Sequence, residues 1–196
     1  MEMTTGSIIT SRVLPSMTQA LVKGGVGFAL ASLCVFATVA FGERWMYTHL
    51  GRSGAYLTWT ILFILLGGSV LGSLVVGRWG WPRFYLLFGV AFFAYAAGWI
   101  LAYFNLHGVT GEWVGSVAGS ILMAFVFACG FGVARLTPKL SVVLFAANSL
   151  GYFAGAAIYD YLGAQIGMLL WGLVYGLCLG AGIGAVLQIS QAQGTH

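Results

Sequence analysis

The stretch GGSVLGSLVVGRWGWPR, residues 67–83, decides the fold that this sequence predicts. Its first half is apolar and places Gly68 four residues before Gly72, a spacing that puts both on one face of a helix. In a membrane-spanning helix such small residues let a second helix approach closely. Its second half is a short cationic turn that contains Arg78, Gly80 and Arg83. We therefore expect one membrane helix to end near residue 77 and the next to start near residue 83.

The composition places the chain among integral membrane proteins. Of its 196 residues, 60% are hydrophobic and only 6% are charged, and the mean hydropathy is +0.97. Soluble domains carry about 25% charged residues. The net charge of +4 comes from very few groups, so it predicts membrane topology and no nucleic-acid partner, which would require a clustered basic surface.

Apolar segments long enough to cross a bilayer recur along the chain, separated by short loops. A crossing needs about 20 predominantly apolar residues. The expected segments are 24–42, 54–77, 83–105, 113–134, 139–162 and 164–189. The predicted fold is an all-α integral membrane bundle of six transmembrane helices that occupies residues 24–189, with a short C-terminal tail over residues 190–196.

Residues 1–23 form a predicted N-terminal cytoplasmic region with two open interpretations. Apolar residues recur there at helical spacing beside polar ones, which favours a short interfacial helix that is interrupted or restarted at Pro15. A flexible tail is the alternative.

The basic residues predict the orientation. With six crossings, one side of the membrane receives the N-terminal region and the second and fourth loops, which carry Arg12, Lys23, Arg78, Arg83, Arg135 and Lys139. The other side receives only Arg44 and Arg52. Since lysine and arginine mark the cytoplasmic side, we expect both termini in the cytoplasm and a location in a bacterial inner membrane.

Glycines at four-residue steps are candidates for close helix packing. The sixth segment carries the longest series, and the fifth and second carry shorter ones: Gly172, Gly176, Gly180 and Gly184, then Gly151 and Gly155, then Gly68 and Gly72. Tight packing within one bundle is one interpretation. The other is that a glycine face meets another subunit or supports sliding between helices.

Polar side chains at membrane depth are the best candidates for a functional site, because hydrocarbon cannot satisfy them. In the fifth segment Asn148, Tyr152, Gly155 and Tyr159 share one helical face, and Asp160 lies near the segment's end. This face is predicted either to line a polar pathway or to bond a neighbouring helix. Asp160 is expected at the interface, paired or hydrated.

No known catalytic pattern is present in the sequence. It contains no nucleophile elbow, zinc-protease motif or phosphate-binding loop, and its three cysteines lie in apolar runs without metal-ligand spacing. We therefore predict a protein that is no enzyme, with no catalytic residues, no cofactor and no metal.

The segment Ser73–Gly80, SLVVGRWG, resembles the cytoplasmic loop between the second and third helices of major facilitator superfamily transporters. That family favours G-x-L-x-D-R-x-G-R there, and Arg78 and Gly80 match it. Gly77 stands where the family has aspartate, and Trp81 replaces the following basic residue. The resemblance implies half of a twelve-helix transporter fold. Residues 51–83 are also similar to the six-helix membrane region fused to some spermidine synthase-like proteins.

Two functional hypotheses follow. The first is a half-transporter or permease-like domain for a small solute, which works as a homodimer or within a larger membrane complex. The second is a structural or accessory subunit that packs against a larger complex. A transporter is expected to contain a polar cavity that reaches Asn148, whereas an accessory subunit is expected to have a filled interior.

Overall fold

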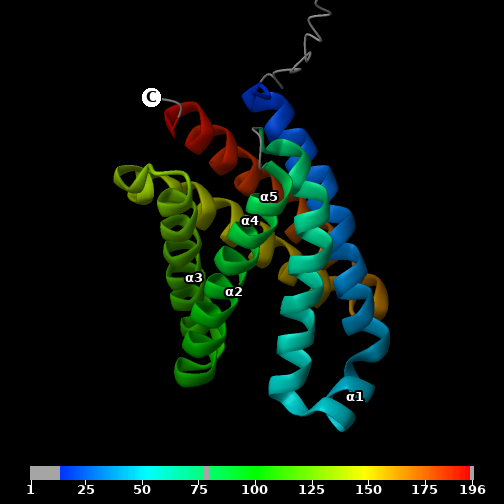
Figure 1. Cartoon of the computed structure of the whole chain (residues 1–196). Helices are drawn as coiled ribbons and strands as arrows, with labels where there is room; N and C mark the ends of the chain where they lie inside the picture. The colour runs from blue at the N-terminus through cyan, green and yellow to red at the C-terminus, as the bar shows by residue number, and fades with distance from the viewer. Residues whose placement is uncertain (1–13, 77–79, 195–196) are drawn as a thin grey trace, which may run out of the picture.

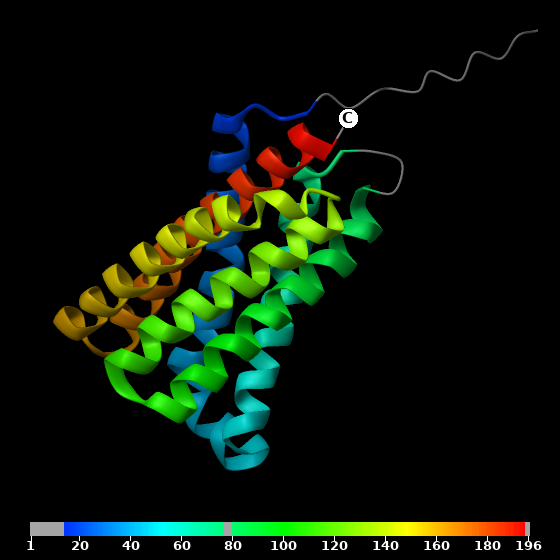
Figure 2. The same ribbon diagram turned by 90° about the vertical axis from the view of Figure 1, so that its left-hand side faces the viewer.

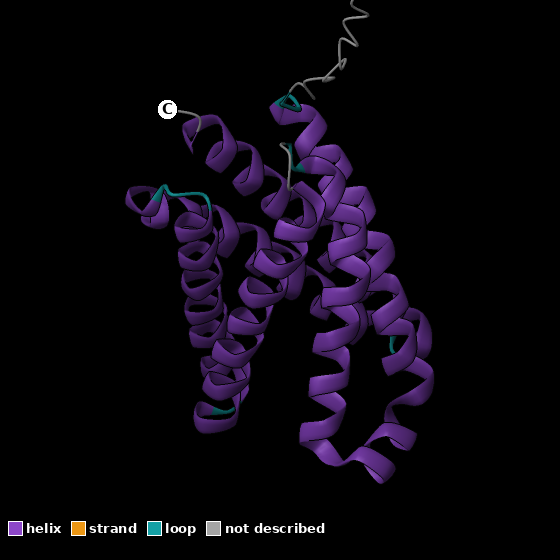
Figure 3. Ribbon diagram, viewed as in Figure 1, coloured by secondary structure: helices purple, strands orange, loops and turns teal. Residues whose placement is uncertain are grey.

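The computed structural model describes residues 14–76 and 80–194, and within them every regular element is helical (Figure 3). In chain order the elements are α1 (Met17–Leu71), the 3₁₀ helix η1 (Gly72–Leu74), α2 (Gly80–Leu106), α3 (Gly108–Gly130), the 3₁₀ helix η2 (Ala134–Leu136), α4 (Thr137–Leu162) and α5 (Ala164–Gly194). In the described residues five helices are long and apolar enough to cross a membrane. The all-helical fold is confirmed, and it is compatible with a multi-pass membrane protein.

Helix α1 turns back on itself at Gly51. It contains 55 residues, which in a straight helix would extend about 80 Å, far more than the roughly 30 Å of bilayer hydrocarbon. At Gly51 the backbone adopts φ 67° and ψ 176°, a conformation that is essentially restricted to glycine. The chain reverses direction at this turn, at the lower end of the molecule in Figure 1. We call residues 17–50 the first arm of α1 and residues 52–71 the second arm.

Two similar turns join α2 to α3 and α4 to α5. Each has two consecutive residues with positive φ, namely His107 with Gly108 and Gly163 with Ala164. The turn positions 51, 107 and 163 are equally spaced along the chain, and each follows the pattern Tyr-x-x-Leu. That pattern consists of Tyr47 and Leu50, Tyr103 and Leu106, and Tyr159 and Leu162. The described chain is therefore a succession of three helical hairpins.

The helix boundaries differ most from expectation in the first arm of α1, which starts before residue 24 and continues to residue 50, where a loop was expected after residue 42. The expected segment 24–42 and most of the expected segment 54–77 belong to the single element α1, which ends at Leu71. This helix starts at Met17 and so includes the residues assigned to the end of the N-terminal region. Ser16 and Gln19 explain this start, because each side chain bonds the other residue's backbone N–H at 3.2 Å, a capping box. Residues 1–13 lie outside the described residues. At the other end of the chain, α5 continues past residue 189 to Gly194.

The densest part of the core lies in the half of the bundle where α1 begins and α5 ends, and these two helix ends lie at the same end of the molecule (Figure 2). The largest fully buried side chains all come from this half: Phe28, Leu71, Leu74, Phe84, Phe88, Met123, Phe127, Leu140, Leu144, Leu179, Ile183 and Leu187. Gln191 joins α5 to the segment after η1, since its Oε1 accepts from the Val76 N–H at 2.9 Å and its Nε2 donates to the Leu74 carbonyl at 3.1 Å. This half of the bundle is closed.

The glycine series of α5 packs against the first arm of α1. A Cβ on Gly176 would lie 2.6 Å from Ala29 Cα and 2.6 Å from Ser32 Cβ, and one on Gly172 would lie 2.6 Å from Phe36 Cγ. Gly180 and Gly184 face the same arm nearer its start. All four glycines of this series thus face residues of the same chain.

Candidate binding cavity

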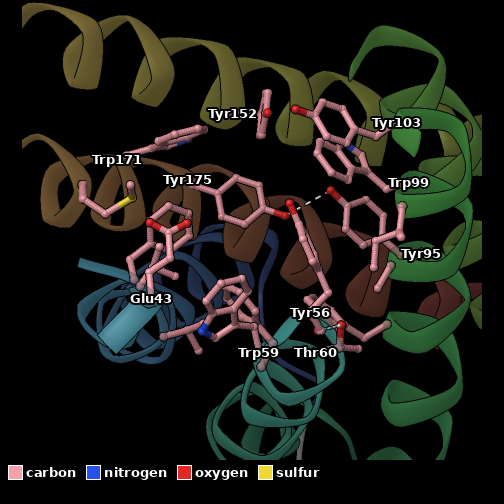
Figure 4. Close-up of a pocket in the computed structure, with 18 of the residues that line it drawn as sticks. Glu43, Tyr56, Trp59, Thr60, Tyr95, Trp99, Tyr103, Tyr152, Trp171 and Tyr175 are labelled. Atoms are coloured by element: carbon pink, nitrogen blue, oxygen red, sulfur yellow. Dashed lines mark hydrogen bonds between the residues drawn. The ribbon is translucent and has the colours of Figure 1, made fainter. Parts of the chain in front are cut away.

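A cavity of about 380 Å³ occupies the half of the bundle that contains the hairpin turns (Figure 4). It is not enclosed, and every α-helix contributes to its wall. Most of its lining is aromatic: Phe36, Tyr47, Tyr56, Trp59, Phe63, Phe92, Tyr95, Trp99, Tyr103, Tyr152, Trp171 and Tyr175. Val35, Val39, Thr60, Ala96, Ile100, Met168 and two glutamates, Glu43 and Glu112, complete it. We call it the aromatic cavity.

The aromatic cavity opens toward the hairpin turns. Its deep residues Tyr95 and Tyr175 are each 6% exposed. Tyr47, which lies one helical turn before Gly51, is 37% exposed, and Glu43 is also exposed. The lining thus becomes steadily more accessible from the centre of the bundle to the turns, while the packed core closes the other end.

A network of hydrogen bonds forms the floor. The Tyr95 hydroxyl donates to Asn148 Oδ1 at 2.6 Å and lies 3.1 Å from the Tyr175 hydroxyl. Because Tyr95 has a single hydroxyl proton, Tyr175 is the donor of the second bond. Asn148 Nδ2 donates to Ser116 Oγ at 3.1 Å. Figure 4 shows the Tyr95 and Tyr175 hydroxyls directed toward each other across the floor. All of these groups are buried, so the network fixes the orientation of both rings.

In two of the hairpins, glycines on one helix make room for large rings of the other. In the α2–α3 hairpin, a Cβ on Gly119 would lie 2.7 Å from Tyr95 Cδ2, and one on Gly115 would lie 3.0 Å from Trp99 Cδ1. Real Cβ atoms essentially never come closer than 3.0 Å to a non-bonded heavy atom of a packed neighbour. The rings can therefore lie against the neighbouring helix because these positions lack side chains.

The α4–α5 hairpin uses the same arrangement with the roles of the helices exchanged. A Cβ on Gly155 would lie 2.9 Å from Trp171 Cγ, and one on Gly151 would lie 3.0 Å from Tyr175 Cα. Both aromatic residues line the cavity. The glycines that the sequence singled out for helix packing on this segment therefore also set the position of the cavity wall.

The tryptophans face the cavity with their ring carbons. The indole nitrogens of Trp59, Trp99 and Trp171 are inaccessible, and within the described part of the chain they have no hydrogen-bond partner. All three residues line the cavity, so the surface they present there is the π system and its carbon edges. Such surfaces bind apolar groups and cations.

The charged groups in the lining are both acidic. Glu43 lies beside the Tyr47 hydroxyl, and Glu112 beside that of Tyr152. Among the described residues that line the cavity there is no lysine or arginine. Arg52 is a neighbour of Tyr56, but its guanidinium carbon lies over the ring of Phe104, 4.8 Å from the centroid.

The structure separates the predicted site residues of α4. Tyr152 lines the aromatic cavity, and Asn148 lies behind the floor with no exposed surface. Gly155 and Tyr159 contact Trp171, with 5.8 Å between the Tyr159 and Trp171 ring centroids. Asp160 is exposed and outside the cavity lining. Of this face, Tyr152 thus lines the cavity, and Asn148, Gly155 and Tyr159 contact side chains of neighbouring helices.

The residues of the predicted cytoplasmic loop lie at the closed end. Arg83 Nη2 donates to the Gly130 carbonyl at 2.5 Å, which ties the start of α2 to the end of α3. A Cβ on Gly80 would lie 3.1 Å from the Val75 carbonyl oxygen. Gly68 in the second arm of α1 faces Tyr85, and Gly72 in η1 faces Trp81. Arg78 lies outside the described residues.

Sequence reasoning missed most of the cavity lining, including the aromatic residues Trp99, Trp171 and Tyr175 and the acidic residue Glu112. A usable signal was present in the hairpins. In the α2–α3 hairpin, Gly115 and Trp99 are the same number of residues from the turn at His107, one after it and one before it. Gly119 and Tyr95 are related in the same way. Pairing each glycine with the aromatic residue across the turn would have identified part of the wall.

The described residues contain no group of three or more His, Cys, Asp or Glu side chains placed to hold a metal ion, and Cys34, Cys129 and Cys178 are free thiols. Comparison of the chain with protein-family models, with curated proteins and with solved structures found no match.

Proposed function

We propose that this chain is a small transporter or permease-like domain that crosses the membrane six times and binds a small solute in the aromatic cavity. The cavity carries the proposal. Ligand sites in proteins typically enclose about 300–1,000 Å³, and this one has about 380 Å³. Its floor, at Tyr95 and Asn148, lies near the middle of α2 and α4, and transporters place their substrate sites near the bilayer midplane.

Six crossings follow if each arm of α1 spans the bilayer once, as do α2 to α5. Lys23, Arg83, Arg135 and Lys139 then lie at the closed end, and Arg44 and Arg52 at the open end. The positive-inside rule supports a cytoplasmic location for the closed end and both termini. In this orientation, the cavity is open to the outside of a cell membrane.

Transport would require the contacts that form the floor of the cavity and the closed half of the bundle to separate. Solute release to the cytoplasm requires separation of the packed core below Tyr95 and Tyr175, together with the contact between Gln191 and the segment after η1. Alternating access commonly occurs by rocking of helix bundles around a central site. The three hairpins are the natural rigid units for such a motion.

From the resemblance to the major facilitator superfamily, this proposal takes only the architecture: a unit of six crossings that pairs with a second copy. The accessory-subunit hypothesis is the alternative, and it expects a filled interior. Only the half of the bundle nearer the chain ends is filled in this way, which favours solute binding.

Cysteine accessibility tests the proposal directly. In a background without Cys34, Cys129 and Cys178, a membrane-impermeant maleimide applied to intact cells is expected to label Ala96→Cys, because this position lines the cavity. Ala91→Cys is the matched control on the same helix, because Ala91 has no exposed surface and is expected to react only after denaturation.

Equal protection of the two cysteines in the native protein would contradict an open cavity. Copurification of a stoichiometric partner in mild detergent, together with that protection, would instead establish the accessory role.

A further inference from the structure

The charge of the aromatic cavity selects the kind of solute it can hold. The whole sequence has four acidic residues against eight basic ones, yet the charged side chains in the lining are Glu43 and Glu112. Two carboxylates around one opening, flanked by low-dielectric protein, produce a negative potential that concentrates cations. Arg52, the neighbouring cation, is directed onto Phe104 instead.

Several neighbouring rings of the wall meet at steep angles. Tyr152 and Trp171 meet at 67° with centroids 5.3 Å apart, and Trp99 and Tyr152 at 58° and 5.7 Å. Trp99 in turn stacks on Tyr103 at 14°. Phe36 continues the wall beyond Trp171, again at 58° and 5.7 Å. Such an arrangement presents several π surfaces to one open cavity, as in sites that recognise alkylated ammonium groups.

The inaccessible tryptophan nitrogens strengthen this interpretation. An indole N–H directed into the cavity would repel a cation, but the nitrogens of Trp59, Trp99 and Trp171 are inaccessible. The tyrosine hydroxyls in the lining add oxygen atoms that can accept from an ammonium N–H.

Other solute classes fit the lining less well. An anion would meet two carboxylates and no basic side chain among the described lining residues. A bare divalent metal ion requires several oxygen ligands within bonding distance, and no group of three acidic or His side chains gathers in the described part of the chain.

We propose that the aromatic cavity binds an organic cation, an alkylated amine or quaternary ammonium compound, whose charge is balanced by Glu43 and Glu112 and whose alkyl groups contact the aromatic wall. This inference rests on the proposed function and names the solute class for the same site.

The test measures binding of tetramethylammonium, choline and benzyltrimethylammonium to the purified full chain by calorimetry and by the fluorescence of the cavity tryptophans. The neutral isostere of choline, 3,3-dimethylbutan-1-ol, is the comparison ligand. We expect saturable binding of at least one cation and binding of the isostere at least about tenfold weaker than that of choline, the effect of the lost charge. Equal affinities, or no saturable binding of any of the three cations, would overturn the inference.

Two acid-to-amide variants locate the binding site. Glu112→Gln is expected to weaken cation binding about tenfold, whereas Asp160→Asn, which removes an exposed carboxylate outside the cavity, is expected to change it less than about twofold. Equal effects of the two variants would overturn the assignment to this cavity.

The cysteine assay separates the two proposals. If Ala96→Cys is labelled in the native protein but the cations do not bind, the inference about solute class fails and the proposed function stands. Protection of Ala96→Cys, in contrast, would remove the open cavity on which both depend.

Discussion

The contact between α5 and the first arm of α1 gives the sharpest prediction about stability. Substitution of Gly176 by alanine places a Cβ 2.6 Å from Ala29 Cα, 2.6 Å from Ser32 Cβ and 2.9 Å from the Phe28 carbonyl oxygen. Optimal separations of carbon atoms are about 3.5–4.0 Å, so the helices must separate locally by about 1 Å. Two of the three atoms belong to the backbone, and a rotamer change cannot relieve the clash.

The expected cost follows from this displacement. A radial gap of about 0.5–1 Å forfeits a quarter to a half of the dispersion energy of the affected contacts, and overpacking costs about 1–3 kcal/mol. Dispersion is a principal source of stability between membrane helices. We expect Gly176→Ala to lower the thermal unfolding temperature in detergent by about 4–8 °C, taking 2 kcal/mol and the scale of a 150–250-residue protein.

The matched control is Gly89→Ala on α2, where the new Cβ would make an ordinary contact of 3.5 Å with Ile64 Cγ2. Both substitutions change helix propensity in the same way, so their difference isolates the packing term. Fluorescence-detected size-exclusion chromatography after heating measures both unfolding temperatures. Identical temperatures for the two variants would refute the argument that α5 lies against α1 at this distance.

Three further predictions concern the turn and the cavity. Gly51→Ala is expected to cost about 1–3 kcal/mol because of its positive φ, while Gly42→Ala on the same arm, with open space around its Cβ, should leave the unfolding temperature nearly unchanged. Gly155→Ala should displace the Trp171 ring, alter the tryptophan emission and weaken solute binding by about 1 kcal/mol in a titration. Asn148→Leu removes two buried hydrogen bonds and should destabilise the protein by about 1 kcal/mol in the thermal assay, whereas a loss above about 3 kcal/mol would show that the network carries more than these bonds.

The positions of most helices were predictable, because each helix coincides with a run of apolar residues long enough to cross a bilayer. The C-terminal end of α4 and the start of α5 were located to the residue, at the turn that contains Gly163. The start of α1 was not located, because the length of an apolar run contains no information about the Ser16 capping box, which extends the helix beyond that run. Helix ends that depend on local capping are invisible to hydropathy.

The candidate site was only partly predictable, for a different physical reason. A buried polar residue such as Asn148 is conspicuous in an apolar segment, so its importance could be inferred, and its bond to Tyr95 shows what it holds in place. Aromatic residues, by contrast, are equally suited to lipid, core and cavity. Trp113 and Trp171 look alike in sequence, yet Trp113 is 45% exposed and Trp171 lines the cavity.

The position of the cavity follows from which helices can approach each other closely. In the α2–α3 and α4–α5 hairpins, glycines such as Gly119 and Gly151 face an aromatic residue across the turn, so each pair of helices packs tightly. In α1 the glycine contacts between the two arms lie at the closed end instead, where a Cβ on Gly27 would meet Val70 and one on Gly67 would meet Phe28. Nearer the turn, both arms carry residues of the cavity lining, such as Tyr47 and Tyr56, and rings from both arms complete the wall that the other hairpins begin. The same small residues that hold the hairpins together thus determine where the bundle stays open.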